Sequence, residues 1–382
     1  MIVLRNSRMV LADEVVQGSL LIDGDRIVSV DAGSTAALES MDLDGDWLLP
    51  GLVEMHTDNL ERHLMPRPSV NWAEMPALLA HDAEVAAAGI TTVFDALGVG
   101  EADPDSLRGS AWHDVVAAFD HCRANDVLRA DHLLHVRCEL PAPNTIELFA
   151  PFMGHERMKL ISLMDHTPGQ RQWEDIGVAR TYYLGKKGWS LEKFERQVEK
   201  AATLQALHVQ PHRQWFVNYC RDTGVRLASH DDTTVEHVLQ AHADGACLSE
   251  FPTTIDAASA ARRLDLHTVM GAPNVLRGGS HSGNVAAADL AAQGLLTVLS
   301  SDYVPSSLMA AAIRLADDGL MSLPAAIATV SSAPATATGL TDRGRIAAGM
   351  RADLVRVRLE QTPDGKRVPI VRAVWRSGRR II

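Results

Sequence analysis

The stretch Leu48-Leu-Pro-Gly-Leu-Val-Glu-Met55, followed by His56-Thr57-Asp58, decides the fold prediction. A compact apolar run that ends directly in polar residues is typical of a buried strand in a parallel sheet. His56 and Asp58 stand two positions apart, so on a strand their side chains point to the same side and can hold one ion. Imidazole nitrogen and carboxylate oxygen suit zinc, with manganese, iron and nickel as alternatives. The segment therefore predicts a strand that ends in a metal site.

The pattern of this segment repeats along the chain, with helix-like segments between compact apolar runs. The eight candidate strands are Leu48–Met55, Thr91–Ala96, His132–Glu139, Lys159–Asp165, Val225–Ser229, Ala246–Glu250, Thr268–Gly271 and Leu295–Ser301. Eight strand-helix repeats predict an α/β fold, a TIM-like (β/α)8 barrel. A doubly wound open sheet explains the alternation too, but it should carry a glycine-rich phosphate loop, and neither GxGxxG nor GxxxxGK[ST] follows an early strand.

The two chain ends have a different pattern, with short apolar stretches separated by turns. Asp23-Gly24-Asp25 breaks the first end and Pro363-Asp364-Gly365 the last. We therefore expect residues 1–50 and 343–382 to form one small composite β-sandwich domain, and residues 51–342 to form the barrel.

Composition limits the partners of the chain. Its 382 residues carry a formal net charge of −12, which argues against a nucleic-acid or anionic-membrane surface. Any anionic ligand must therefore meet a local basic pocket. The four cysteines show no CxxC spacing, and we find neither a secretory signal nor an apolar run of the roughly 18 residues that span a bilayer. We expect a cytoplasmic protein without nucleic-acid or membrane partners.

Metal-ligand residue types stand where the candidate strands end. They are His56, Asp58, Glu139, His166, His230, Glu250 and Asp302. In a barrel these ends share one face, where active sites are assembled. Each residue alone could be a polar strand end that contacts loop amides, but the set predicts a metal centre. Asp231 is left as a partner of a ligand histidine, and Thr233 or Thr234 is expected to cap the next helix.

A second group of residues follows the same strand ends. It comprises Arg62, His63, Arg67, Arg171, Arg277, Ser280, His281 and Asn284. Arginine forks match phosphate oxygens, and neighbouring glycines let backbone amides approach a ligand. Asn284 opens a helical pattern over Val285–Leu290, whose amino end would favour an anion. The alternative for each arginine is an ordinary surface ion pair with a neighbouring carboxylate.

The layout resembles the amidohydrolase superfamily, and within it the family of α-D-ribose 1-methylphosphonate 5-triphosphate diphosphatases. The motifs that carry the resemblance are Gly51–Leu60, Leu163–Gln172, Ala228–Asp232, Glu250–Thr254, Met270–Asn274, Arg277–Asn284 and Ser300–Tyr303. The superfamily usually has a second histidine where Asp58 stands and a histidine where Glu250 stands. Both departures suit the diphosphatase family.

The resemblance implies a reaction of phosphonate catabolism in the carbon–phosphorus lyase pathway. The sugar triphosphate would be hydrolysed to the 5-phosphate and diphosphate by a metal-bound hydroxide that attacks the α-phosphorus. Asp302 would accept the proton, and Glu139 would bridge a second ion. The second group of residues, from Arg62 to Asn284, would bind the triphosphate. One or two divalent ions, zinc first, would be the cofactor.

Two alternative functions stay open from the sequence. An amide or cyclic-amide hydrolase would use the same ligands and Asp302 on a carbonyl carbon. A non-catalytic metal-binding subunit of the carbon–phosphorus lyase system would need the ligands but no proton acceptor. A homo-oligomer also stays open.

Overall fold

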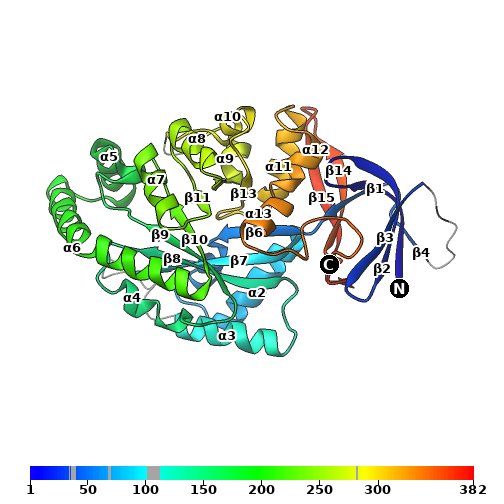
Figure 1. The fold of residues 1–382 in the computed structure, drawn as a ribbon, viewed down its shortest axis with the longest axis horizontal. Coiled ribbons are helices and arrows are strands. Elements are labelled where there is room, and N and C mark those ends of the chain that lie inside the picture. Colours follow the sequence, from blue (N-terminus) through cyan, green and yellow to red (C-terminus); the bar gives the residue numbers. More distant parts are fainter. Residues whose placement is uncertain (34, 36–39, 68–69, 101–111, 281–282) are drawn as a thin grey trace. The chain divides into compact units, whose positions relative to one another are not determined.

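The computed structural model describes residues 1–33, 35, 40–67, 70–100, 112–280 and 283–382 (Figure 1). Its strands are β1 (Ile2–Val10), β2 (Val15–Asp23), β3 (Arg26–Ala32), β4 (Ser40–Asp42), β5 (Trp47–Pro50), β6 (Leu52–Thr57), β7 (Ile90–Val99), β8 (Asp131–Glu139), β9 (Met158–Met164), β10 (Arg226–His230), β11 (Leu248–Glu250), β12 (His267–Gly271), β13 (Val298–Ser300), β14 (Leu354–Gln361), β15 (Arg367–Arg376) and β16 (Arg379–Arg380).

The helices alternate with the central strands. They are α1 (Asn59–Leu64), α2 (Glu74–Ala87), α3 (Trp112–Ala124), α4 (Thr145–Leu148), α5 (Ile176–Lys187), α6 (Leu191–Thr223), α7 (Val235–Ala243), α8 (Ile255–Arg263), α9 (Ala272–Arg277), α10 (Ala287–Ala292), α11 (Ser307–Asp317), α12 (Leu323–Ala328) and α13 (Ser332–Ala337). Short 3-10 turns cover Ala150–Phe152 and Arg171–Trp173. Among these helices, none is long and apolar enough to cross a bilayer.

The barrel predicted from the sequence is confirmed. Strands β6 to β13 form one eight-stranded sheet in chain order, and a parallel bridge from Thr57 to Asp302 joins its first and last strands. All positions of β6 and β7 are buried, as expected for parallel strands covered on both faces.

One predicted strand proves to be two. The run Leu48–Met55 is divided at Gly51: β5 joins the sheet of the chain ends, and β6 begins the barrel. A Cβ atom at Gly51 would lie 2.3 Å from Thr91 Oγ1 and 2.8 Å from Asp353 Cβ. Glycine is therefore required where the chain passes from one sheet to the other.

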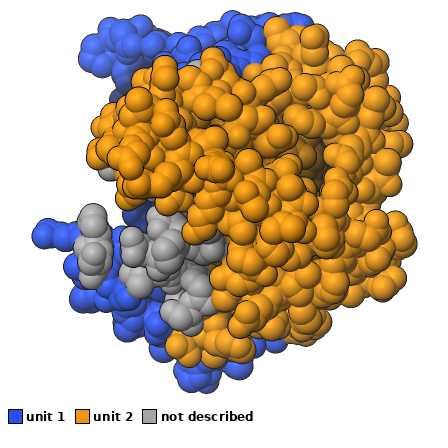
Figure 2. All heavy atoms as spheres, turned by 90° about the vertical axis from the view of Figure 1, so that its left-hand side faces the viewer, with its two compact units in different colours: residues 1–95, 118–133, 270–382 blue, residues 96–117, 134–269 orange. Residues whose placement is uncertain are grey.

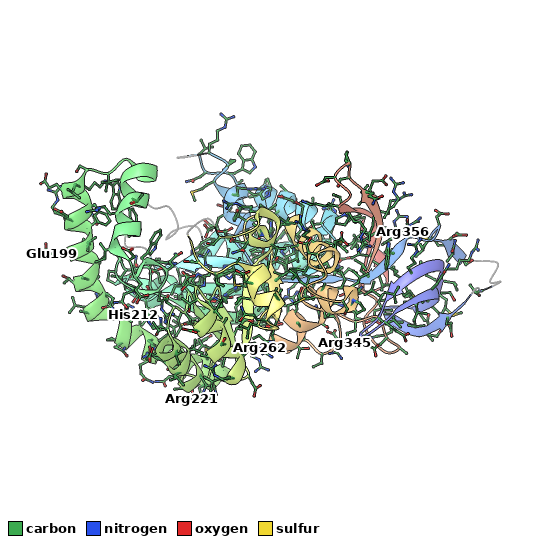
Figure 3. The ribbon with its side chains drawn as sticks, turned by 90° about the horizontal axis from the view of Figure 1, so that it is seen from above. Glu199, His212, Arg221, Arg262, Arg345 and Arg356 are labelled. Carbon is green, nitrogen blue, oxygen red and sulfur yellow. The ribbon has the colours of Figure 1, made fainter. Side chains whose placement is uncertain are left out.

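The chain ends form a composite sheet, and in Figure 1 their blue and red strands lie side by side. Its order is β16-β15-β14-β5-β1-β2-β3, with β4 beside β1, and β5 runs antiparallel to β14. Leu4, Leu354 and Trp375 belong to its buried apolar core. Arg356, labelled in Figure 3, adds an ion pair of 2.6 Å from its Nε to Asp46 Oδ2.

The chain divides into two compact units, coloured separately in Figure 2. Unit 1 comprises residues 1–95, 118–133 and 270–382, and unit 2 comprises residues 96–117 and 134–269. The predicted domain boundaries, after residues 50 and 342, stay a prediction.

Candidate active site

In unit 1, His56, Asp58 and Asp302 lie where the first and last barrel strands meet. The backbone N–H of Asp302 donates to the carbonyl of His56 at 3.2 Å. The Asp302 carbonyl accepts from Thr57 Oγ1 at 2.7 Å and from the N–H of Asp58 at 3.2 Å. These bonds fix the backbone that carries three of the predicted metal-site residues.

Glu54, a buried carboxylate at this junction, was not predicted as a site residue from the sequence. Glu54 accepts from the backbone N–H groups of His56 at 2.7 Å and Ser301 at 2.5 Å. Burial raises the pKa of Glu54 to about 7, although these hydrogen bonds act to lower it. The one signal in the sequence is a carboxylate inside an otherwise apolar strand, two positions before a predicted ligand. Glu54 thus joins the ends of β6 and β13 through their backbones.

In unit 2, the ends of four neighbouring strands bring predicted ligands together. His166 Nδ1 lies 2.5 Å from Glu139 Oε2, and His230 Nδ1 lies 3.2 Å from Glu250 Oε2. Asp231 Oδ2 lies 3.7 Å from Nε2 of both His166 and His230. His166, His230 and Asp231 offer three ligand atoms within 4.8 Å of one another. Their nitrogen and oxygen donors match a zinc-type ion, so Asp231, predicted as a partner of a ligand histidine, is one of the residues that could hold a metal.

The electrostatics of this group favour an ionised carboxylate. Burial alone would raise the pKa of Glu139, but the charge and hydrogen bonds of His166 outweigh it and lower the pKa to about 2. His166 in turn has a raised pKa, because Glu139 and Asp231 outweigh the effect of burial. Glu139 is thus a carboxylate at neutral pH, the form that ligates metals.

Further buried groups hold these ligands in place. Ser162 Oγ donates to Glu250 Oε2 at 2.6 Å and lies 2.5 Å from His135 Nε2. His135 therefore contacts the predicted ligand Glu250 through Ser162, and its Nε2 also lies 3.7 Å from Glu250 Oε1. Nothing in the local sequence indicates this, because the contacts join three strands.

Three strand ends adopt the left-handed backbone. The φ angles are +54° at Asp231, +53° at Phe251 and +57° at Asp302, directly after or near the ends of β10, β11 and β13. Such angles are uncommon outside glycine and gather at functional sites. Here they turn the chain sharply where the predicted ligands stand.

The predicted cationic residues have varied surroundings. Arg171 Nη1 donates to Asp232 Oδ1 at 2.7 Å and to the carbonyl of His230 at 2.6 Å. Asp232 is fully buried and also accepts from Ser229 and Ser249. Arg171 therefore binds the backbone of a predicted ligand in addition to any phosphate role.

The remaining predicted residues lie in unit 1. Arg62 and His63 are on α1, and both contact Glu84 of α2. Arg277 ends α9 and is exposed, while Ser280 and Asn284 are partly buried and Arg67 pairs through its backbone with Val70. His281 lies outside the described residues.

Two local predictions about helix starts had different outcomes. Thr234 caps α7 by accepting from the N–H of His237, as predicted. The helix after Asn284 begins later than predicted, because α10 starts at Ala287, whose N–H donates to Asn274 Oδ1 at 2.9 Å. The side chain that contacts the start of this helix is therefore that of Asn274, and not that of Asn284.

Comparison with known proteins shows the family of the chain. Residues 221–382 match the model of the amidohydrolase family. The chain is 43% identical over 381 residues to α-D-ribose 1-methylphosphonate 5-triphosphate diphosphatase of Escherichia coli (strain K12), covering 99% of this chain and all of that protein.

Two solved structures share the fold at low sequence identity. N-isopropylammelide isopropylaminohydrolase from Burkholderia multivorans has a TM-score of 0.61 at 19% identity, covering 99% of this chain and 97% of that chain. N-acetyl-D-glucosamine-6-phosphate deacetylase from Mycobacterium smegmatis has a TM-score of 0.61 at 18% identity, covering both chains fully. By its full-length similarity to the diphosphatase, the chain belongs to the α-D-ribose 1-methylphosphonate 5-triphosphate diphosphatase family, within the amidohydrolases.

Proposed function

We propose that this protein hydrolyses α-D-ribose 1-methylphosphonate 5-triphosphate to the 5-phosphate and diphosphate. The single observation that carries the proposal is the 43% identity along the whole chain to a diphosphatase of that name. The acid-anhydride chemistry also agrees with a site rich in carboxylate and imidazole groups.

The donor set fits a divalent metal. The ligands we propose are His56, Asp58, Glu139, His166, His230, Glu250 and Asp302, with Asp231 added from the structure. Active sites of such barrels are built at the carboxyl ends of the strands, where all of these residues stand. A structural zinc ion takes four ligands, so the set is large enough for one or two ions. Zinc is our first choice, with manganese, iron and nickel as alternatives. When bound, the metal supplies a water of lowered pKa, toward about 7, and polarises the phosphoryl oxygens.

Asp302 is the proton acceptor in this proposal. Water attacks the α-phosphorus, the new P–O bond forms, and the bond from that phosphorus to the bridging oxygen breaks, so diphosphate leaves. Asp302 takes the proton of the water, and its backbone is fixed by hydrogen bonds to His56, Thr57 and Asp58. These bonds fix the backbone from which the carboxylate of Asp302 extends.

The triphosphate requires positive charge in a protein of net charge −12. The residues we propose for it are Arg62, His63, Arg67, Arg171, Arg277, Ser280, His281 and Asn284. Among them, Arg171 is held by the buried Asp232, so we expect it to orient the His230 backbone as much as to contact phosphate.

Phosphorus NMR of the purified protein with the sugar triphosphate, combined with metal analysis, tests the proposal. We expect signals of the 5-phosphate and diphosphate to appear together, and one or two equivalents of divalent metal. Cleavage of amides without cleavage of the triphosphate would instead favour the amide hydrolase. Bound metal without turnover of either class would favour the non-catalytic subunit.

A further inference from the structure

A buried chain of polar side chains runs from α1 through α2 to β7 and β8, all within unit 1. Its members are Asn59, His81, Asp82, Glu84, Asp95 and His132. All except Glu84 are at most 5% exposed. The proposed reaction does not use any of them, so their retention in the core calls for a physical reason.

Glu84 is the outer end of this chain and contacts two of the proposed phosphate ligands. Arg62 Nη2 donates to Glu84 Oε1 at 3.1 Å, and His63 Nε2 lies 2.8 Å from Glu84 Oε2. Asn59 Nδ2 donates to the same Oε2 at 3.0 Å. One carboxylate of α2 thus holds three side chains of the six-residue helix that follows the predicted ligand Asp58.

The inner end of the chain fixes the amide of Asn59. Its Nδ2 lies 3.0 Å from His81 Nδ1, while His81 Nε2 lies 2.6 Å from Asp95 Oδ1. An amide nitrogen only donates, so Nδ1 of His81 is the acceptor and its proton is on Nε2. With both N–H bonds of Asn59 engaged, by Glu84 and His81, the amide cannot turn over without losing both hydrogen bonds.

His132, at the inner end of this row of polar side chains, carries a positive charge. Its Nδ1 lies 2.8 Å from Asp95 Oδ2 and its Nε2 lies 3.2 Å from Asp82 Oδ1, so both nitrogens face carboxylates and both donate. Asp82 also accepts from the backbone N–H groups of Arg129 and Ala130, each at 2.9 Å. Arg129 Nη1 lies 3.1 Å from Asp82 Oδ2, so two cations, His132 and Arg129, face the two carboxylates of this group.

We propose that Glu84 is a positioning residue that orients Arg62 and His63 for a polyphosphate ligand, held in register by the buried chain from Asn59 to His132. The proposal deepens the proposed function and rests on it for the identity of the ligand. His81, Asp95 and His132 also have the composition of a metal site. Their nitrogen–oxygen distances and the acceptor role of His81 are those of hydrogen bonds, so we assign them to a hydrogen-bonded chain.

Binding of inorganic triphosphate to the metal-loaded protein, measured by calorimetry, tests the role of Glu84 without turnover. For Glu84→Gln we expect Kd to rise about tenfold, because glutamine has one acceptor oxygen, whereas the carboxylate offers Oε1 to Arg62 and Oε2 to His63. Glu74→Gln, on the same helix, is the matched control and should change Kd less than about twofold. Equal Kd values for wild type and Glu84→Gln, with only a lowered Tm, would overturn the positioning role.

Kinetics with the sugar triphosphate separate the positioning role of Glu84 from the proposed function. With the sugar triphosphate, Glu84→Gln should raise KM about tenfold and leave kcat within about threefold, and Glu84→Asp should restore part of the loss. If no turnover occurs but triphosphate binding falls in Glu84→Gln, the proposed function fails and the positioning role stands.

Nitrogen NMR of the imidazole rings tests the inner chain. We expect His81 protonated at Nε2 alone and His132 protonated at both nitrogens in the wild type. A doubly protonated His81, or loss of one equivalent of metal in Asp95→Asn, would overturn the hydrogen-bonded assignment.

Discussion

The imidazole of His132 should make folding stability depend on pH in a specific range. Burial alone would lower its pKa, but Asp95 and Asp82 outweigh burial and raise it from 6.5 to about 9. At about 1.36 kcal/mol per pH unit, this difference corresponds to about 3 kcal/mol of stability. Because the pKa is raised in the folded state, the stabilisation is fully present below pH 6.5 and is lost as the pH rises through 9.

Urea unfolding of wild type and His132→Gln between pH 6 and pH 10 measures this contribution. At pH 6 we expect the variant to be less stable by about 3 to 5 kcal/mol, because the buried Asp95 loses its cationic partner, whereas Asp82 keeps Arg129. The wild type should then lose about 3 kcal/mol more than the variant by pH 10, since other titrating groups cancel in the difference. Parallel pH curves for the two proteins, or an NMR pKa of His132 near 6.5, would refute the reasoning.

Three further changes test the site. Asp302→Asn keeps a side-chain oxygen that can ligate a metal but loses the carboxylate base, so it should lower kcat about 1,000-fold or more while metal content and the urea midpoint stay at wild-type values; unchanged kcat would remove Asp302 as proton acceptor. Arg171→Met should destabilise the fold by about 3 to 5 kcal/mol, measured by urea unfolding, because Asp232 would be left as an unpaired buried charge. Removal of metal by a chelator should abolish turnover, measured by diphosphate release, and added zinc should restore it; full activity after complete metal removal would contradict the account.

Much of the fold can be predicted from the sequence, because each parallel strand is a compact apolar run with a polar end. The ends of β8 and β11, at Glu139 and Glu250, agree with the predicted ones, and β10 ends at His230, one residue after the predicted Ser229. The division at Gly51 could not be predicted, since the apolar run continues through it without a polar break. Only the close approach of Thr91 and Asp353, distant in sequence, explains the glycine there.

The candidate site could be predicted only in part. Predicted ligands such as His166 and His230 were recognisable by their place after a strand. Their partners were not: Glu54, His135 and Asp232 lie in or beside apolar strands, and each is hydrogen-bonded to a group on, or directly after, another strand. Such contacts are set by the register of the barrel, which no local pattern contains.

The source of the oxygen in the products tests the central claim most directly. Hydrolysis of α-D-ribose 1-methylphosphonate 5-triphosphate in water enriched in ¹⁸O should place one label in the sugar 5-phosphate and none in diphosphate, visible as an isotope shift in the phosphorus spectrum. This result follows from attack of water at the α-phosphorus. Label in diphosphate would place the attack at the β-phosphorus, and an absence of both products would contradict the diphosphatase assignment itself.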